Sequence, residues 1–228
     1  MKDSLATRFP PEALKFLRGL KRNNRREWFL AHRDEYETFV RGPMLEIIQR
    51  LAGDLHAFAP DIVCDPKTAM YRIYRDVRFS ANKAPYKTHV AASFPTRGLP
   101  KHEGAGLYFH VSPTEIWAGG GMYAPQTAQL QAVREHVASH ARRLRAIVDS
   151  PGFRRTFGAL DGERLQRVPR GFAKDHPAAE YLKYRQFLAG CELKPSLATS
   201  TKFYATIVNV FREAAPLIRF LNDPLLNR

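Results

Sequence analysis

The chain has 228 residues, of which 44% are hydrophobic and 25% are charged. This length and balance are typical of a globular domain with its own core, and they exclude a disordered chain, a fibrous chain and a mini-protein that folds only around disulfides or metals. Lys and Arg outnumber Asp and Glu by 36 to 22, a net charge of +14, which favours an anionic partner.

Cysteine content and apolar runs indicate the compartment. The two cysteines, Cys64 and Cys191, do not form the dense pattern of a secreted scaffold. The first residues lack the apolar core of a secretion signal, and no stretch resembles a membrane span, which needs roughly 20 predominantly apolar residues. We therefore expect a cytoplasmic protein with no membrane partner.

The N-terminal third has the apolar period of amphipathic helices. Pro11 is expected in the first turn of a first helix. Asn24, followed by Glu27, resembles a capping box that would start a second helix. Pro43 would open a third. In each segment apolar residues recur every three to four positions, so one face of each helix should enter the core.

Between residues 62 and 123 the period changes to two, which is typical of half-buried strands. Strands are predicted over Ala69 to Arg75, Thr88 to Phe94, Gly106 to Val111 and Glu115 to Gly119. Because the connections are too short for parallel crossovers, the sheet should be largely antiparallel.

A long helix is predicted to begin at Ala124 and Pro125 and to end near Ser150, and a further strand is predicted over Gln186 to Leu193. A final helix should follow Thr201 and be kinked by Pro216. The sequence thus predicts one α+β domain over residues 1–228. Its largely antiparallel sheet, of four or more strands, would be flanked by N-terminal helices, a long central helix and a C-terminal helix.

The positive charge is concentrated in one region. Residues 66–102 carry eight Lys or Arg and one Asp, and within them aromatic residues are interleaved with the cations. Arg78, Lys83 and Lys87 should converge at one end of a hairpin, with Asp76 orienting an arginine. Arg, Lys, Ser and Tyr side chains together suit an oxyanion. The predicted ligand-binding set is Arg72, Arg75, Asp76, Arg78, Ser80, Lys83, Tyr86 and Lys87.

Three motifs carry a family resemblance. They are the long motif from Arg72 to Thr88 (RxxRDxRFSxxKxPYKT), the pair Tyr108–Val111 and Gly119–Pro125, and the segment Pro169–Pro177. The chain resembles an uncharacterised bacterial and fungal family, a domain of unknown function, from about Phe9 to Leu221. The resemblance implies one self-contained domain and names no activity or catalytic residue.

Other candidate sites are weaker. His136 and His140 have a zinc-compatible spacing but lack the glutamate of metalloprotease helices. His89 and His110 would lie on neighbouring strands without a fixed ligand spacing. Gly119 to Gly121 lack the Lys and Ser/Thr of a phosphate loop and should instead allow close backbone packing or a bulge beside the site. The sequence therefore predicts no cofactor and no metal, and it leaves open whether the protein is an enzyme.

Three hypotheses about function remain. The first is a protein that binds, and in one version processes, a phosphate-bearing or other anionic small molecule at the basic hairpin. The second is sequence-independent binding of nucleic acid, with aromatic side chains as stacking surfaces. The third is a structural or protein-interaction module in which the basic motif is internal bracing. The oligomeric state is not determined by the sequence.

Overall fold

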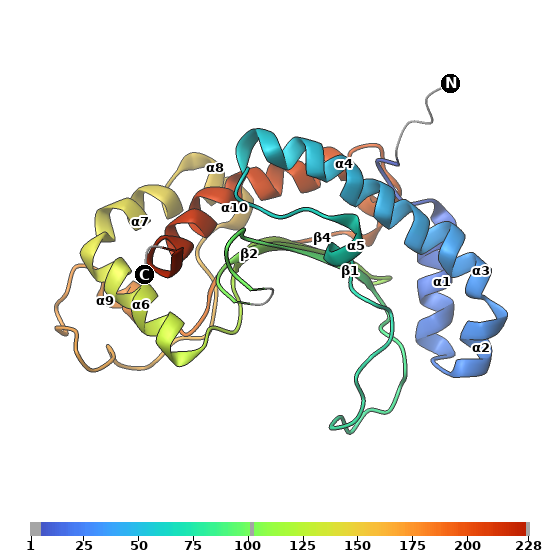
Figure 1. The fold of residues 1–228 in the computed structure, drawn as a ribbon, viewed down its shortest axis with the longest axis horizontal. Coiled ribbons are helices and arrows are strands. Elements are labelled where there is room, and N and C mark those ends of the chain that lie inside the picture. The colour runs from blue at the N-terminus through green and yellow to red at the C-terminus, as the bar shows by residue number, and fades with distance from the viewer. Residues whose placement is uncertain (1–5, 101–102, 227–228) are drawn as a thin grey trace.

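A four-stranded sheet and its surrounding helices confirm the predicted α+β class. The computed structural model describes residues 6–100 and 103–226. In Figure 1 the sheet lies at the centre, with α4 and α10 on one side of it and a long hairpin extending from the other side. Within these two ranges, none of the helices combines the length and apolar composition needed to cross a membrane.

The first and third of the predicted N-terminal helices are present, whereas the second differs from the prediction. They are α1 (Pro11–Arg22), α2 (Arg26–Ala31), α3 (Arg33–Glu35), a π-helical turn (Tyr36–Arg41) and α4 (Gly42–Phe58). The prediction of one helix starting at Asn24 is wrong. The Asn24 side chain does not cap a helix but binds the main chain of Tyr86, with Nδ2 2.9 Å from the carbonyl oxygen and Oδ1 3.0 Å from the amide nitrogen. The helix therefore starts later, at Arg26.

The sheet has the order β1-β2-β3-β4, and every neighbouring pair is antiparallel, as predicted. The strands are β1 (Val90–Pro95), β2 (Gly106–Val111), β3 (Ile116–Met122) and β4 (Phe187–Leu193). The predicted strand over residues 69–75 is wrong. A short helix, α5 (Pro66–Ala69), occupies its start because Asp65 caps the helix by accepting from the Lys67 amide at 3.0 Å. Beyond it the chain forms only isolated bridges.

The remaining helices follow β3 and β4. They are α6 (Thr127–Ser139), α7 (Ala141–Val148), α8 (Pro151–Phe157), α9 (Ala179–Leu182), a 3-10 turn (Pro195–Thr199) and α10 (Phe203–Leu226). The predicted long central helix is divided at His140, which leaves the helical region with φ −124° and ψ 34°. Its ring and its amide both contact the carbonyl of His136, which closes α6. α10 continues past Pro216.

The two faces of the sheet have different surroundings. One face packs on α10, with the rings of Phe94 and Phe109 5.6 and 6.2 Å from that of Phe211. Buried apolar residues from the N-terminal helices, all four strands and α10 belong to this one core, as a single domain requires. We call the opposite surface, which α10 does not cover, the open face. It carries Tyr71, His89, Ser93, Tyr108, His110 and Trp117, each only partly buried.

Candidate functional site

The predicted site residues lie on a projecting hairpin, residues 72–87, which we call the basic arm (Figure 1). Its two limbs are joined by main-chain hydrogen bonds from the Arg75 amide to the Pro85 carbonyl at 2.9 Å and from the Lys87 amide to the Ile73 carbonyl at 2.8 Å. At its base the Tyr71 amide donates to the Ala91 carbonyl at 2.9 Å. The arm is thus an extension of the edge of β1.

Tyr86 anchors the arm to the N-terminal helices. Its side chain is 3% exposed and its ring stacks on Phe29 with the centroids 4.3 Å apart. Burial raises the pKa of the Tyr86 hydroxyl. Asn24 holds the main chain of the same residue. Of the predicted ligand-binding residues, Tyr86 therefore lies in the core rather than on the surface of the arm.

Arg75 and Ser80 brace the arm from within. The Arg75 guanidinium donates from Nη1 to the Ala84 carbonyl at 3.0 Å and from Nη2 to Ser80 Oγ at 3.4 Å. Both side chains are only partly exposed. For these two residues the geometry matches internal bracing of the hairpin.

Asp76 and Arg78 form an exposed ion pair, in which the carboxylate orients the guanidinium. Arg78 Nε lies 3.0 Å from Oδ1 and Nη2 lies 2.8 Å from Oδ2 of the carboxylate. These hydrogen bonds from Arg78 lower the pKa of Asp76. The same guanidinium lies 5.8 Å from the ring centroid of Phe79, whose side chain is 96% exposed.

Of the two lysines expected to converge with Arg78, only Lys83 lies near it. Lys83 Nζ lies near it, 3.0 Å from the Val77 carbonyl oxygen and 3.5 Å from the carbonyl oxygen of Arg78. Lys87 Nζ instead lies 3.0 Å from the Arg72 carbonyl oxygen and 4.9 Å from the Tyr71 ring centroid. The two limbs are extended, so residues 83 and 87 are separated along the arm, and Lys87 lies at its base.

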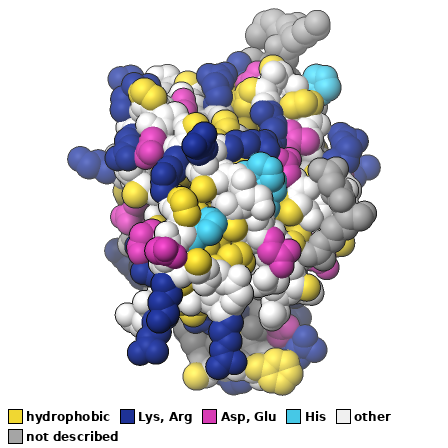
Figure 2. All heavy atoms as spheres, turned by 90° about the vertical axis from the view of Figure 1, so that its left-hand side faces the viewer, with side chains coloured by type: hydrophobic (Ala, Val, Ile, Leu, Met, Phe, Trp, Pro, Cys, Tyr) yellow, Lys and Arg dark blue, Asp and Glu magenta, His cyan; other side chains and the backbone are white. Residues whose placement is uncertain are grey.

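The arm therefore presents cations that also support its shape. A lysine bound to a main-chain carbonyl keeps its full positive charge, because the carbonyl is neutral, and Asp76 is the one carboxylate of the arm. Arg72, Arg78 and Lys83 are exposed. On the face of the molecule shown in Figure 2, by contrast, Lys and Arg are spread around the surface with acidic side chains among them.

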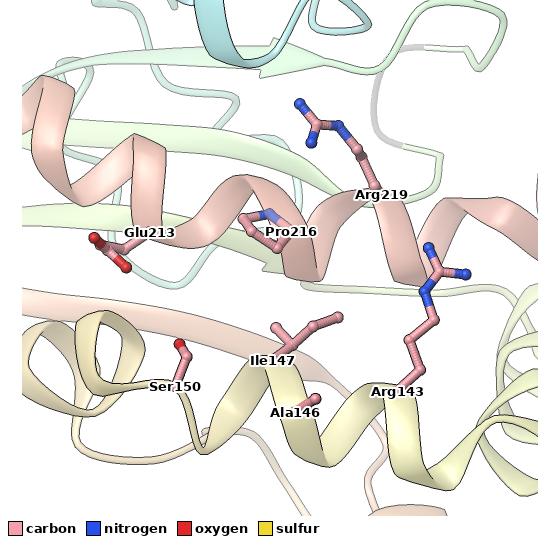
Figure 3. A pocket seen from close by; sticks show the side chains of 7 residues that line it. All are labelled: Arg143, Ala146, Ile147, Ser150, Glu213, Pro216 and Arg219. Carbon is pink, nitrogen blue, oxygen red and sulfur yellow. The ribbon is translucent and has the colours of Figure 1, made fainter.

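Two hollows lie away from the arm. One, of about 390 Å³, opens between α7 and α10, and Figure 3 shows the Arg143 side chain extending from α7 toward α10, whereas the Arg219 side chain extends from α10 away from α7. Both arginines are paired, Arg143 with Asp223 at 2.6 Å and Arg219 with Asp61 at 3.4 Å. The other hollow, of about 560 Å³, lies beside the residues that precede α1. Neither is lined by a residue of the basic arm.

The open face carries a hydrogen-bonded group that sequence reasoning missed. Tyr108 Oη lies 3.2 Å from His110 Nδ1, and His110 Nε2 lies 3.3 Å from Glu115 Oε1. Burial raises the pKa of Tyr108 to about 12. Burial also lowers the pKa of His110, although the Glu115 carboxylate opposes that shift. At neutral pH the ring is thus neutral, with its proton on Nε2 toward Glu115.

His89 and two further side chains complete this face. The His89 ring centroid is 5.2 Å from that of His110. Burial, then electrostatic repulsion from His110 when it is protonated and from Lys87, lowers the pKa of His89 to about 4. Ser93, which pairs with Tyr108 in the strand register, has a buried Oγ without a hydrogen-bond partner among the described residues. The Trp117 ring is 5.8 Å from that of Tyr108.

The two histidines at zinc-compatible spacing and the three glycines of β3 were the other candidates from the sequence. The rings of His136 and His140 stack 4.3 Å apart. Residues 6–100 and 103–226 contain no group of three His, Cys, Asp or Glu side chains placed to hold a metal ion. The glycines of β3 do allow close packing, as predicted, because a Cβ on Gly119 would lie 2.2 Å from the Ala189 carbonyl oxygen.

The chain belongs to a family of conserved hypothetical proteins, DUF2461, whose model matches residues 12–220. This confirms the resemblance to a domain of unknown function over nearly the whole chain. The description of the family names no activity. No curated protein and no solved structure matches the chain.

Proposed function

We propose that the protein binds single-stranded nucleic acid along the basic arm and the open face. The observation that carries this proposal is Phe79, a large aromatic side chain that is 96% exposed near the end of a projecting, positively charged arm. Aromatic rings and cations that alternate along a surface bind single strands, because cations attract phosphates while bases stack on the rings.

Charge and shape support the same proposal. The arm carries Arg72, Arg75, Arg78, Lys83 and Lys87 against Asp76. A projecting element reaches into the charge field of a polyanion, and each phosphate that a cation neutralises releases counterions. Tyr74, which is 50% exposed, adds a second ring on the arm.

The open face extends the aromatic surface. Tyr71, Tyr108 and Trp117 follow one another across it with ring centroids 6.3 and 5.8 Å apart. An antiparallel sheet with helices on one face and aromatic side chains on the other is a frequent platform for unpaired bases. The Tyr71 ring lies at the base of the arm beside Lys87, so the two surfaces are continuous.

The hypothesis of an anionic small molecule stays a prediction with less support from the geometry. Such a ligand is held best in a concave site where donors converge, whereas the cations of the arm are distributed along its length. Internal bracing fits Arg75 best and is compatible with nucleic-acid binding by the exposed cations.

Fluorescence anisotropy tests the proposal. The protein is titrated into a labelled single strand of about 12 nucleotides, a length within the range of known site sizes, at several salt concentrations. Phe79→Ala should weaken binding about 5- to 150-fold, the effect of losing one stacked base. Arg78→Gln should reduce the magnitude of the slope of log affinity against log salt by about 0.7. The matched control is Arg155→Gln in α8, which Figure 1 shows on the other side of the sheet.

Two results would contradict the proposal. The first is no binding of the wild-type protein at low salt. The second is that Phe79→Ala and Arg78→Gln bind no more weakly than Arg155→Gln. Thermal stabilisation by a phosphorylated small molecule, lost in Arg78→Gln, would instead favour the small-ligand hypothesis.

We further propose the cytoplasm as the compartment. In support, Cys64 and Cys191 are both free thiols, which is the common state of cysteines in a reducing compartment.

A further inference from the structure

His89 differs from the other polar groups of the open face because its ring has no hydrogen-bond partner within residues 6–100 and 103–226. Both nitrogens of the neighbouring His110 are already engaged, by Tyr108 and by Glu115. His89 is neither fully buried nor fully exposed. Of the two imidazoles on this face, His89 is therefore the one whose nitrogens are available to exchange a proton with a bound molecule.

Tyr108 is the second group able to exchange a proton. Its hydroxyl donates to His110 Nδ1, because Glu115 keeps the proton of His110 on Nε2. His110 lies between the two groups, in ring contact with His89 at 5.2 Å and with Tyr108 at 5.7 Å. The face thus holds a base and an acid on either side of one histidine.

We infer that His89 and Tyr108 are the general base and general acid of a site that cleaves RNA. The inference rests on the proposed function, since the arm and the aromatic surface would supply the strand. RNA is the substrate class that this pair fits, because its own 2′-hydroxyl is the nucleophile and the protein has only to move protons.

The reaction balances with these two groups. His89 takes the proton of a ribose 2′-hydroxyl, and the 2′-oxygen forms a bond to the adjacent phosphorus. The bond between phosphorus and the 5′-oxygen breaks, and the departing 5′-oxygen takes the hydroxyl proton of Tyr108, which gives up its hydrogen bond to His110 Nδ1. The products are a 2′,3′-cyclic phosphate and a 5′-hydroxyl end. Protonated His89 then returns its proton to the Tyr108 oxygen through water.

The surroundings keep both groups in the required starting states. Burial, with repulsion from protonated His110 and from Lys87, lowers the pKa of His89, while Glu115 raises it, and the net result is a neutral base at pH 7. Tyr108, whose pKa burial raises to about 12, is fully protonated. The Lys87 ammonium, two residues before His89, lies close enough to influence His89 and would stabilise charge on the phosphate.

The experiment measures cleavage and binding on the same samples. A labelled single-stranded RNA and the DNA of the same sequence are incubated with the full chain in the presence of EDTA, and products are identified by mass. The variants are His89→Gln and Tyr108→Phe, with folding checked by thermal melting. The matched control is His56→Gln, at an exposed position of α4. Contaminating nuclease would appear equally in every preparation.

We expect the wild type and His56→Gln to cleave RNA but not DNA and to leave a 2′,3′-cyclic phosphate. His89→Gln and Tyr108→Phe should each be about 10²- to 10⁴-fold slower while still binding RNA. RNA that is bound but not cut, DNA cut as fast as RNA, or unchanged rates in His89→Gln would overturn the inference and leave the proposed function standing. Failure to bind RNA while DNA is bound would also overturn the inference, and failure to bind either strand would instead refute the proposed function.

Discussion

The stability of the protein should depend on pH through His89. Replacing this histidine by glutamine removes an ionisable group that the folded state keeps neutral. Burial, with repulsion from protonated His110 and from Lys87, lowers the pKa of His89 from 6.5 to about 4, against the opposing carboxylate of Glu115. The unfolded chain has no such environment, so its histidine titrates near the ordinary value.

The sign follows from which state binds the proton first. Above about pH 7.5 His89 is essentially neutral in both states and has little effect on the pH dependence of stability. As the pH falls from 6.5 toward about 4, the unfolded chain gains a proton that the folded protein does not, so stability is lost over this interval. At about pH 4.5 the loss from this one group approaches about 2 to 3 kcal/mol, an upper bound because the ring is partly solvated.

Urea unfolding at about pH 7, 5.5 and 4.5, values that span the interval between the two pKa values, measures the effect. The free energy of unfolding of the wild type should fall more steeply between these pH values than that of His89→Gln, and the difference should approach the figure above. His56→Gln, changed at an exposed position, should follow the wild type. Parallel curves for the wild type and His89→Gln would refute the burial argument, because they would show that His89 titrates alike in both states.

Three further changes test the arm and the sheet. Asn24→Ala should lower the free energy of unfolding by about 1 to 3 kcal/mol in urea, because it leaves the main-chain groups of Tyr86 unpaired. Gly190→Ala should cost about 1 to 3 kcal/mol and shift tryptophan fluorescence, since the new Cβ would lie 2.1 Å from the Trp117 ring. Asp76→Asn should tighten RNA binding at low salt and steepen the salt slope by up to about 0.7, because it frees an exposed guanidinium from its carboxylate. Unchanged anisotropy titrations would contradict the last.

The sheet was predictable where its strands are half-buried. Residues 106–111 alternate between core and open face, as the buried Leu107 and Phe109 show, and β2 has the predicted bounds. Residues 69–75 have a similar pattern, yet they pair only at isolated bridges. The difference arises because a helical turn at Pro66 and the departure of the arm from the sheet interrupt the ladder, and alternation alone does not report either.

The contact between Asn24 and Tyr86 marks a limit of local reasoning. The two residues are 62 positions apart, so the sequence around Asn24 predicts a helix cap and gives no sign of the distant partner. Only the folded arm presents both main-chain groups of residue 86 to that amide. A local motif predicts a cap correctly when no distant partner competes for the side chain, and here one does.

The basic arm was visible in the sequence, whereas the open face was not. The signal for the open face was present, because Tyr108 and His110 occupy the outward positions of a strand whose inward positions are apolar. What the sequence lacked was the information that helices would cover one face of the sheet only. A partly buried Tyr and His on the outward side of the strand become informative once α10 is known to cover the other face.

Bracing and binding are usually treated as alternatives for a cluster of arginines and lysines, but the arm shows why they coexist. Lys83 donates its hydrogen bonds to neutral carbonyls of the hairpin, which fixes the side chain without cancelling its charge. The positive charge of Arg78, which is paired with a carboxylate in an exposed ion pair, is partly offset. A cation that donates to a neutral carbonyl therefore attracts a polyanion more strongly than one that donates to a carboxylate. Because Asp76 is the one carboxylate of the arm, it is the residue that lowers the positive charge of the arm.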